Sequence, residues 1–195
     1  MPVLGEFKLV VRRGVFTYSF KASSVSEAFG ILEDIGGGFF QLVDSGGRVR
    51  SVGHVFFYKP SWSSCSAECL TVVMDQMFKG LGGLLVERLT CIKARVYEVN
   101  EDAWGRLEGG EVSAVRASSD EDIIRLLEKI AGEGRIVVLF TGDKKLATAV
   151  KEKGSLVEAH YIPPGKHEDG KDIVEEMAMR IMARAGVYCG ESQNK

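Results

Sequence analysis

The alternation of apolar and polar positions divides the first sixty residues into four strands and one helix. Ser24 begins the helix, because its hydroxyl can cap the first free amides while Glu27 reaches back, and the glycines at 36–38 end it. The first two strands are separated by a short polar turn and predict a hairpin. This order predicts a ββαββ unit, with strands over residues 7–11, 15–20, 39–43 and 48–58.

A second helix is predicted after the break at residues 60–64. Its apolar positions fit a period of 3.6 and are Leu70, Val73, Met74, Met77, Phe78 and Leu81. A strand at 92–99 and a polar stretch at 100–110 come next. We place a domain boundary in this polar stretch. The chain then has an α+β domain over residues 1–99, which includes the linking helix and strand, and a second domain over residues 111–187.

Strands and helices alternate regularly in the second domain. The order indicates βαβ crossovers, and therefore a doubly wound, mainly parallel, Rossmann-like α/β sheet. Residues 136–140 are apolar on both faces, as a central strand must be. Ligands of such sheets bind at the carboxyl ends of the strands, so the turn Thr141-Gly142-Asp143 is the best-placed candidate site. The elements are strands at 112–115, 136–140 and 156–162 and helices at 119–131, 144–153 and 171–185.

Composition narrows the class of protein. A net charge of −2 over 195 residues excludes the overall basicity of proteins that coat nucleic acid without specificity. The N-terminus lacks a signal pattern and no apolar run approaches the ~20 residues of a membrane span, so we expect a cytoplasmic protein. Asparagine and glutamine are scarce beside abundant charged residues, which is typical of thermophiles.

The four cysteines are too few for a secreted disulfide scaffold, so we expect reduced thiols. Cys65 and Cys69 lie one helical turn apart after a strand, which is similar to thioredoxins except that the redox motif is Cys-x-x-Cys. With His54 and Cys91 the pair could instead form a zinc site. Buried reduced cysteines are the interpretation we favour, because free cysteine packs as a small hydrophobe.

Carboxylates gather where two predicted helices begin. Asp143 follows the central strand, and Asp120 and Asp122 lie in the first turn of the preceding helix. In a parallel sheet these helix starts share one edge, where clustered carboxylates can bind Mg²⁺ or Mn²⁺ that activates water against a phosphodiester. The alternative is that all three are helix caps, since aspartate complements the helix dipole and satisfies free amides.

Residues 118–122 followed by 136–143 resemble the later half of PIN-like and NYN-type nuclease domains, over roughly residues 112–162. The resemblance implies cleavage of RNA with Mg²⁺ or Mn²⁺, and Asp143 and either Asp120 or Asp122 as catalytic metal ligands. Such domains also begin with an apolar strand that ends in a ligand aspartate. Asp44, in a β-turn, and Asp102, in the polar stretch, are the candidates for that role.

Two other interpretations of the same region remain open. The turn at 141–143, with Lys166 downstream, is similar to part of haloacid-dehalogenase-type hydrolases, whose opening Asp-x-Asp strand is missing here. The amides of this turn, followed by Lys144-Lys145, could also receive a phosphate, although no Walker motif is present. His160 lies in a predicted strand, and the nearby loop could contact a phosphate or nucleic acid backbone, although we favour a solvated linker: Lys166, His167 and Lys171.

The N-terminal strands combine arginines with aromatic residues. Such a surface suits the stacking of single-stranded bases, although core packing accounts for some of the rings because neighbours in a strand point to opposite faces. RNA or another single-stranded nucleic acid is therefore the expected partner, either of a nuclease or of a non-enzymatic nucleic-acid-binding or complex-assembly module. The residues are Arg12, Arg13, Arg48 and Arg50 with Phe39, Phe40, Phe56, Phe57 and Tyr58.

Overall fold

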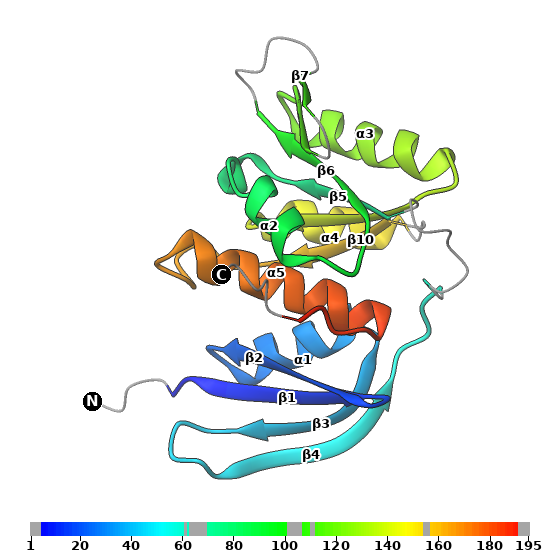
Figure 1. Cartoon of the computed structure of the whole chain (residues 1–195). Coiled ribbons are helices and arrows are strands. Elements are labelled where there is room, and N and C mark those ends of the chain that lie inside the picture. The colour runs from blue at the N-terminus through cyan, green and yellow to red at the C-terminus, as the bar shows by residue number, and fades with distance from the viewer. Residues whose placement is uncertain are drawn as a thin grey trace, which may run out of the picture. The chain divides into compact units, whose positions relative to one another are not determined.

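The chain divides into two compact units, seen in a computed structural model that describes residues 5–60, 62, 70–100, 107–109, 112–153 and 157–190 (Figure 1). The first unit consists of Met1–Ser61 and Glu176–Tyr188. The second consists of Trp62–Glu175 and Cys189–Lys195. The division therefore falls inside the last helix, α5 (Gly170–Ala185), which contributes to both units.

The first unit has the ββαββ order predicted from the sequence. Its strands form an antiparallel sheet in the order β2-β1-β3-β4, with the β1–β2 hairpin at one edge (Figure 1). Ser24 caps the helix as expected, since its hydroxyl accepts a 3.0 Å hydrogen bond from the amide of Glu27. The elements are β1 (Phe7–Arg13), β2 (Phe16–Ala22), α1 (Val25–Asp34), β3 (Gly37–Val43) and β4 (Val49–Phe56).

One face of this sheet carries the core of the first unit. Side chains alternate along each strand, so β1 turns Leu9 and Val11 inward, against α1 and the last ten residues of α5. Arg180 of α5 is 1% exposed and pairs with Asp34 of α1 at 3.2 Å and with Glu176 at 2.9 Å. A buried cation held by two carboxylates fixes how these two helices pack, because an unpaired buried charge is very costly.

The second unit is built on a six-stranded sheet in the order β10-β9-β5-β6-β8-β7. Every pair from β10 to β8 is parallel, and only the edge strand β7 runs antiparallel. The expected α/β class with a mainly parallel, doubly wound sheet is confirmed. The strands are β5 (Leu70–Met74), β6 (Ala94–Val99), β7 (Leu107–Gly109), β8 (Val112–Val115), β9 (Ile136–Thr141) and β10 (Val157–Tyr161).

Helices cover both faces of the parallel sheet. Residues such as Val73, Val99 and Leu139 point to one face and form a core with α3 (Asp120–Gly132) and α4 (Lys144–Glu152). Val96 points to the other face, where it approaches the start of α2 (Gly82–Arg88). A short 3-10 turn, η2 (Gln76–Phe78), leaves β5. The sheet is therefore buried on both sides, as parallel sheets require.

The prediction of a helix beginning near Leu70 is wrong. Leu70–Met74 is strand β5, and all five residues are buried between neighbouring parallel strands. Its β-branched centre suits a strand, and a short apolar run has no periodicity that separates helix from strand. The helical spacing seen in the sequence arises because the strand is followed at once by η2 and α2.

Because residues 70–74 form a strand of the second unit, the boundary between the units also differs from the expected one. The boundary expected at 100–110 separates strands that the structure pairs in one sheet, because β5 and β6 adjoin β9 and β8. The first unit is complete with four strands and its helices, so the change of unit comes at Ser61. The strand at Ala94–Val99 was expected at this position, although it was assigned to the other unit.

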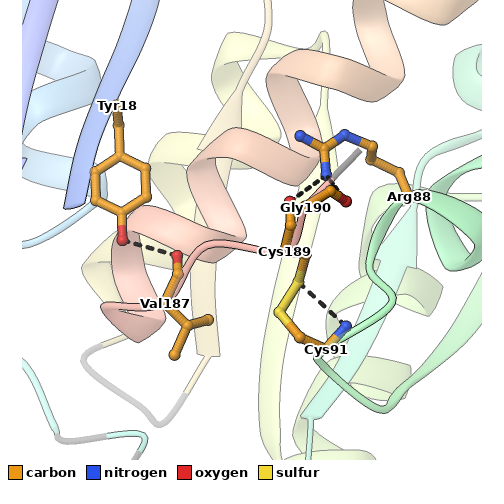
Figure 2. The surroundings of a disulfide bond; sticks show 6 residues. All are labelled: Tyr18, Arg88, Cys91, Val187, Cys189 and Gly190. Carbon is orange, nitrogen blue, oxygen red and sulfur yellow. Dashed lines mark hydrogen bonds between the residues drawn. A yellow bond between two sulfur atoms is a disulfide. The ribbon is translucent and has the colours of Figure 1, made fainter. Parts of the chain in front are cut away.

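The expectation of reduced thiols is wrong for two of the four cysteines. Cys91, which follows α2, forms a disulfide with Cys189, which follows α5, and Figure 2 shows its surroundings. The amide of Cys91 also approaches the Cys189 sulfur at 3.3 Å, and Arg88 donates a 2.8 Å hydrogen bond to the carbonyl of Cys189. Arg88 pairs in addition with Glu175 at 2.8 Å. The C-terminal tail is thus held to the second unit by a covalent bond and by Arg88.

The helices were also compared with the dimensions of a lipid bilayer. Within the described part of the chain, none of them combines the length and the apolar character needed to cross one.

Candidate functional site

Asp75 lies at the carboxyl end of β5, the strand between β9 and β6 in the parallel sheet. Its amide donates a 2.9 Å hydrogen bond to the carbonyl of Phe140, so its backbone continues the pairing with β9. Its carboxylate Oδ1 accepts a 2.8 Å hydrogen bond from the amide of Gln76, which starts η2. Asp75 therefore occupies the edge at which ligands of open α/β sheets bind.

Thr141 joins Asp75 to the turn that holds Asp143. The Thr141 side chain is fully buried at the end of β9, and its hydroxyl donates a 2.7 Å hydrogen bond to Oδ2 of Asp75. The same hydroxyl accepts a 3.0 Å hydrogen bond from the amide of Asp143. One buried hydroxyl thus fixes two acidic residues from neighbouring strands.

Asp143 is the N-cap of α4. Its Oδ1 accepts hydrogen bonds from the amides of Lys145 at 2.9 Å and Leu146 at 3.3 Å. Its other carboxylate oxygen accepts no hydrogen bond from the described part of the chain. The capping interpretation of Asp143 is therefore correct for one oxygen, and the second oxygen remains available to a ligand.

Asp120 is the third carboxylate whose electrostatics involve this edge. It is exposed at the start of α3, and its carboxylate makes no hydrogen bond within the described ranges. Partial burial raises its pKa above the ordinary value, and repulsion from Asp143 and then Asp75 raises the pKa further. The negative charges of Asp143 and Asp75 therefore act on Asp120.

Asp122 has a different environment from Asp120. Its carboxylate turns back to accept hydrogen bonds from the hydroxyl of Ser118 at 2.9 Å and the amide of Ser118 at 3.2 Å. The Ser119 hydroxyl accepts from the amide of Asp122 at 3.2 Å, which completes a capping box. The Ser118 bonds lower the pKa of Asp122. Of the two expected candidates, Asp120 is the one coupled to Asp143.

The carboxylates at this edge could bind a divalent cation only with the help of water or substrate. Across the described ranges, no three His, Cys, Asp or Glu side chains lie close enough together to hold a metal ion. Carboxylate oxygens are nevertheless the ligands that Mg²⁺ prefers, and Mg²⁺ usually takes one or two of them and completes its shell with water and substrate phosphate. Asp143 and Asp120 each have oxygen atoms to offer in this way. The residues fit an open, partly hydrated site and do not form a closed protein cage.

The remaining candidates from the sequence lie elsewhere. Asp44 closes the β3–β4 turn by accepting from the amides of Gly46 and Arg48, at 3.0 and 2.9 Å, so it is a turn residue of the first unit. His160 is buried in β10 with its ring 5.3 Å from that of Phe140. Asp102, Cys65 and Cys69 lie outside the described residues.

The expected zinc interpretation is also affected. Cys91 is joined to Cys189 and so is not a thiolate ligand. His54 lies on the exposed strand β4, where its ring stacks on Phe39 with centroids 4.0 Å apart. Cys91 is therefore bonded to Cys189 and His54 stacks on Phe39, so neither contact is one that a zinc site would use.

Sequence reasoning missed Asp75, although a signal for it was present. The run Leu70-Thr71-Val72-Val73-Met74 is short, apolar and β-branched at its centre, and an aspartate follows it directly. A buried strand that ends in aspartate is the first element of the PIN-like pattern, which was sought at Asp44 and Asp102. Asp75 follows β5, the buried strand beside β9.

Comparisons with known proteins do not identify the chain. No protein-family model matches it, and no curated protein matches it. A short-chain dehydrogenase from Leptospira borgpetersenii serovar Hardjo-bovis (strain JB197), solved with bound NAD+, is similar at 12% sequence identity and a TM-score of 0.29. That match covers 72% of this chain and 80% of the dehydrogenase. A likeness at this level carries no argument about function.

Proposed function

We propose that the protein is a PIN-like ribonuclease that uses Mg²⁺ or Mn²⁺ at the carboxyl edge of the parallel sheet. Asp120 and Asp143 would be the direct ligands, and Asp75, whose two oxygens already accept hydrogen bonds, would act on the cation through a bound water. The observation that carries the proposal is the hydrogen-bonded connection from Asp143 through Thr141 to Asp75, with Asp120 electrostatically coupled to both aspartates. Asp75 follows an apolar strand, as the first acid of such nucleases does.

The chain's own residues have separable tasks in this proposal. Thr141 orients the carboxylate of Asp75 and the backbone of Asp143 from a buried position. One carboxylate oxygen of Asp143 accepts hydrogen bonds from the first amides of α4, and the other can bind a ligand. Asp120 has no hydrogen bond to break among the described residues and can turn toward a cation or a water molecule. Partial burial and then repulsion from Asp143 and Asp75 raise its pKa, and a bound cation would relieve the repulsion.

A divalent cation bound here would supply two things: a lower pKa for a bound water and neutralisation of phosphate charge. The protein contributes oxygen ligands and their orientation. The amides of Lys145 and Leu146 are already satisfied by Asp143, so they do not compete for the phosphate. RNA is the substrate class that the resemblance to PIN-like and NYN-type domains implies.

The test is cleavage of a single-stranded RNA by the full chain in the presence of Mn²⁺, with Asp75→Asn, Asp120→Asn and Asp143→Asn. Asparagine keeps the side-chain oxygen that caps a helix, so these variants should fold. Each is expected to lower the rate at least 10²-fold, because a carboxylate that binds the cation directly or through water is lost. Removal of the cation with EDTA should abolish cleavage in the parent protein.

Matched control variants show whether a loss of activity comes from the proposed site or from the loss of any nearby negative charge. Glu121→Gln removes one negative charge from the same turn of α3, and its cleavage rate should equal that of the parent. Asp122→Asn should change the rate far less than Asp120→Asn, because Asp122 is engaged with Ser118. Equal activity of Asp143→Asn and the parent would refute the nuclease assignment.

The alternative function is a binding or assembly module without catalysis. It is favoured by the caps: Asp75 and Asp143 each satisfy local amides, and the described residues contain no ready-made group of three metal ligands. In that case the same RNA would bind in EDTA and remain uncut after Mn²⁺ is added. The asparagine variants would then bind it as the parent does.

A further inference from the structure

The outer face of the antiparallel sheet in the first unit carries exposed aromatic rings. Phe39 on β3 is 53% exposed and Phe56 on β4 is 79% exposed. Phe39 and His54 occupy opposite positions of the β3–β4 ladder, and their rings stack with centroids 4.0 Å apart and planes 12° apart. The His54 and Phe56 rings meet edge to face at 5.5 Å. We call Phe39, His54 and Phe56 the aromatic platform.

Core packing does not explain the platform. The rings that pack inward from these strands belong to other residues, such as Phe40 and Phe20, which are 7% and 3% exposed. Phe39 and Phe40 are adjacent and therefore point to opposite faces, as expected for a strand. A large ring left half or more in water loses the stabilisation of burial. The platform therefore serves something other than folding.

Exposed cations lie on the same face of the sheet as the platform. Arg12 lies opposite Phe39 on β1, with its guanidinium 5.7 Å from the centre of the Phe39 ring. Arg12, Lys8 and Lys21 are exposed and form no ion pair with any described residue. The four strands contain no aspartate or glutamate, whereas the whole chain has a net charge of −2. This face is therefore a locally positive surface on an acidic protein.

The surface beside the platform also has hollows. Two hollows of about 410 and 580 Å³ lie beside the platform, and both are lined by Arg12, Phe39 and His54. Gly53 lines one of them, and a Cβ at this position would meet the inward-facing ring of Phe40 at 3.1 Å. Volumes of this order are typical of sites for small flat ligands. Along β1, Lys8 lies four residues from Arg12, about 13 Å at the rise of a strand.

From these contacts we propose that this face binds single-stranded RNA. Bases would stack on Phe39, His54 and Phe56, which is how sheet surfaces hold unpaired bases. Arg12, Lys8 and Lys21 would pair with the phosphates. An acidic protein partner would use the cations but would leave the stacked rings without a matching group. The site belongs to the first unit, needs no metal and is independent of the carboxylates proposed for cleavage.

The experiment measures binding of a fluorescent 12-nucleotide RNA to the full chain in EDTA, so that cleavage cannot intervene. Phe39→Ala and Phe56→Ala should each raise the dissociation constant roughly 5- to 100-fold, the usual effect of removing one stacking ring. Phe39→Trp should retain the affinity because it retains a stacking surface. Arg12→Gln should weaken binding and lower the slope of log K against log salt by about one.

Two controls make the result decisive. Arg125→Gln removes an exposed charge, 77% accessible, from the second unit and should leave binding unchanged. Glu121→Gln should also bind as the parent does, and because binding is measured in EDTA, failure of the nuclease proposal would not affect this one. Each variant is compared with the parent by circular dichroism, and because the substituted side chains are exposed, all should fold.

Several outcomes would overturn the proposal. It fails if the RNA does not bind, or if Phe39→Ala and Phe56→Ala bind it as tightly as Arg125→Gln does. It also fails if only DNA of the same sequence binds. Sedimentation measurements complete the test: a dimer that Phe39→Ala dissociates, together with no RNA binding, would mean that the face is covered by a second copy of the chain.

Discussion

The Thr141 hydroxyl donates a 2.7 Å hydrogen bond to Asp75, which lies 66 positions earlier in the chain on the neighbouring strand. Because the same hydroxyl accepts from the amide of Asp143, its loss would disturb both acidic residues at once. Thr141 is fully buried and cannot be replaced there by water without some rearrangement. These two hydrogen bonds explain how a buried residue holds Asp75 and the backbone of Asp143 in place.

Thr141→Val tests the positioning role of the Thr141 hydroxyl. Valine has nearly the same shape but no hydroxyl, so an oxygen of Asp75 and the amide of Asp143 lose their partner, at a cost of about 1–3 kcal/mol in the free energy of unfolding. RNA cleavage should fall at least tenfold beyond the loss explained by unfolding. Urea denaturation and initial rates measure the two effects. Thr141→Ser restores the hydroxyl and should recover most of the activity; a serine variant as slow as the valine variant would contradict the positioning role.

The architecture of the second unit could be predicted from the sequence because most of its elements have strong local signals. Ile136–Thr141 is long, apolar and followed by a capping aspartate, and Ser119 marks the start of α3. Strand β5 lacked such a signal, since five apolar residues fit either a helix or a strand. Only pairing with β6 and β9, which are distant in sequence, decides the conformation of Leu70–Met74. The error hid Asp75.

The choice between Asp120 and Asp122 depended on a local rule that the sequence already contained. In α1, Glu27 turns back to the amide and hydroxyl of Ser23, both in reach of one carboxylate oxygen. Asp122 repeats this arrangement with Ser118 in α3. The three-residue spacing from Ser24 and Ser119 marks both as capping boxes. The coupling of Asp120 to Asp75 and Asp143, in contrast, requires the folded sheet.

Asp120→Asn should separate stability from activity. The folded pKa of Asp120 is raised, so the folded state holds its proton more tightly than the unfolded state does. Its contribution is therefore favourable below the ordinary pKa of 3.8 and is lost as the pH rises through the folded pKa. Above that window, Asp120→Asn should be slightly more stable than the parent, by less than about 0.5 kcal/mol because the side chain is exposed.

The measurement is the thermal midpoint of the parent and of Asp120→Asn from pH 3 to pH 8, without divalent ions, with Glu121→Gln as the control for a lost charge. The two curves should converge at the acid end and separate as the pH rises. Addition of Mn²⁺ should stabilise the parent more than the variant, because binding to the folded state adds to its stability. A variant that is less stable at neutral pH would contradict repulsion at Asp120.

The disulfide between Cys91 and Cys189 should be a main source of stability in the second unit. It closes a loop with a sequence separation of 98, and cross-links of long loops typically contribute about 2–4 kcal/mol to the free energy of unfolding. Cys91→Ala and Cys189→Ala should each lose that amount, and the double variant should lose little more, since one bond is removed in all three.

A reductant gives the matching control. It should lower the urea midpoint of the parent and leave that of the double variant unchanged, which separates this bond from any effect at Cys65 and Cys69. A parent protein that is indifferent to reductant would contradict a structural disulfide. Disulfides inside cells are characteristic of hyperthermophiles, so the expected cytoplasmic location and thermophilic source, both of which stay predictions, are compatible with this bond.

Tyr18 should set the alkaline limit of the first unit. Its ring is fully buried and its hydroxyl donates a 2.7 Å hydrogen bond to the carbonyl of Val187. Burial raises the pKa of Tyr18 from 10.0 to about 12, and the charge of Arg13 offsets only part of this. The unfolded phenol ionises first, so stability is fully present below pH ~10 and about 2–3 kcal/mol is lost as the pH rises to ~12.

Tyr18→Phe tests this limit. It should cost about 1 kcal/mol at neutral pH, because the hydrogen bond to Val187 is lost, and it should remove most of the decline above pH 10. Phenolate absorbance at 295 nm reports the titration, and unfolding in urea at each pH reports the stability. Tyr58→Phe, at a fully exposed position, is the control and should keep the decline. If Tyr18→Phe loses stability in parallel with the parent above pH 10, a group other than Tyr18 must cause the decline.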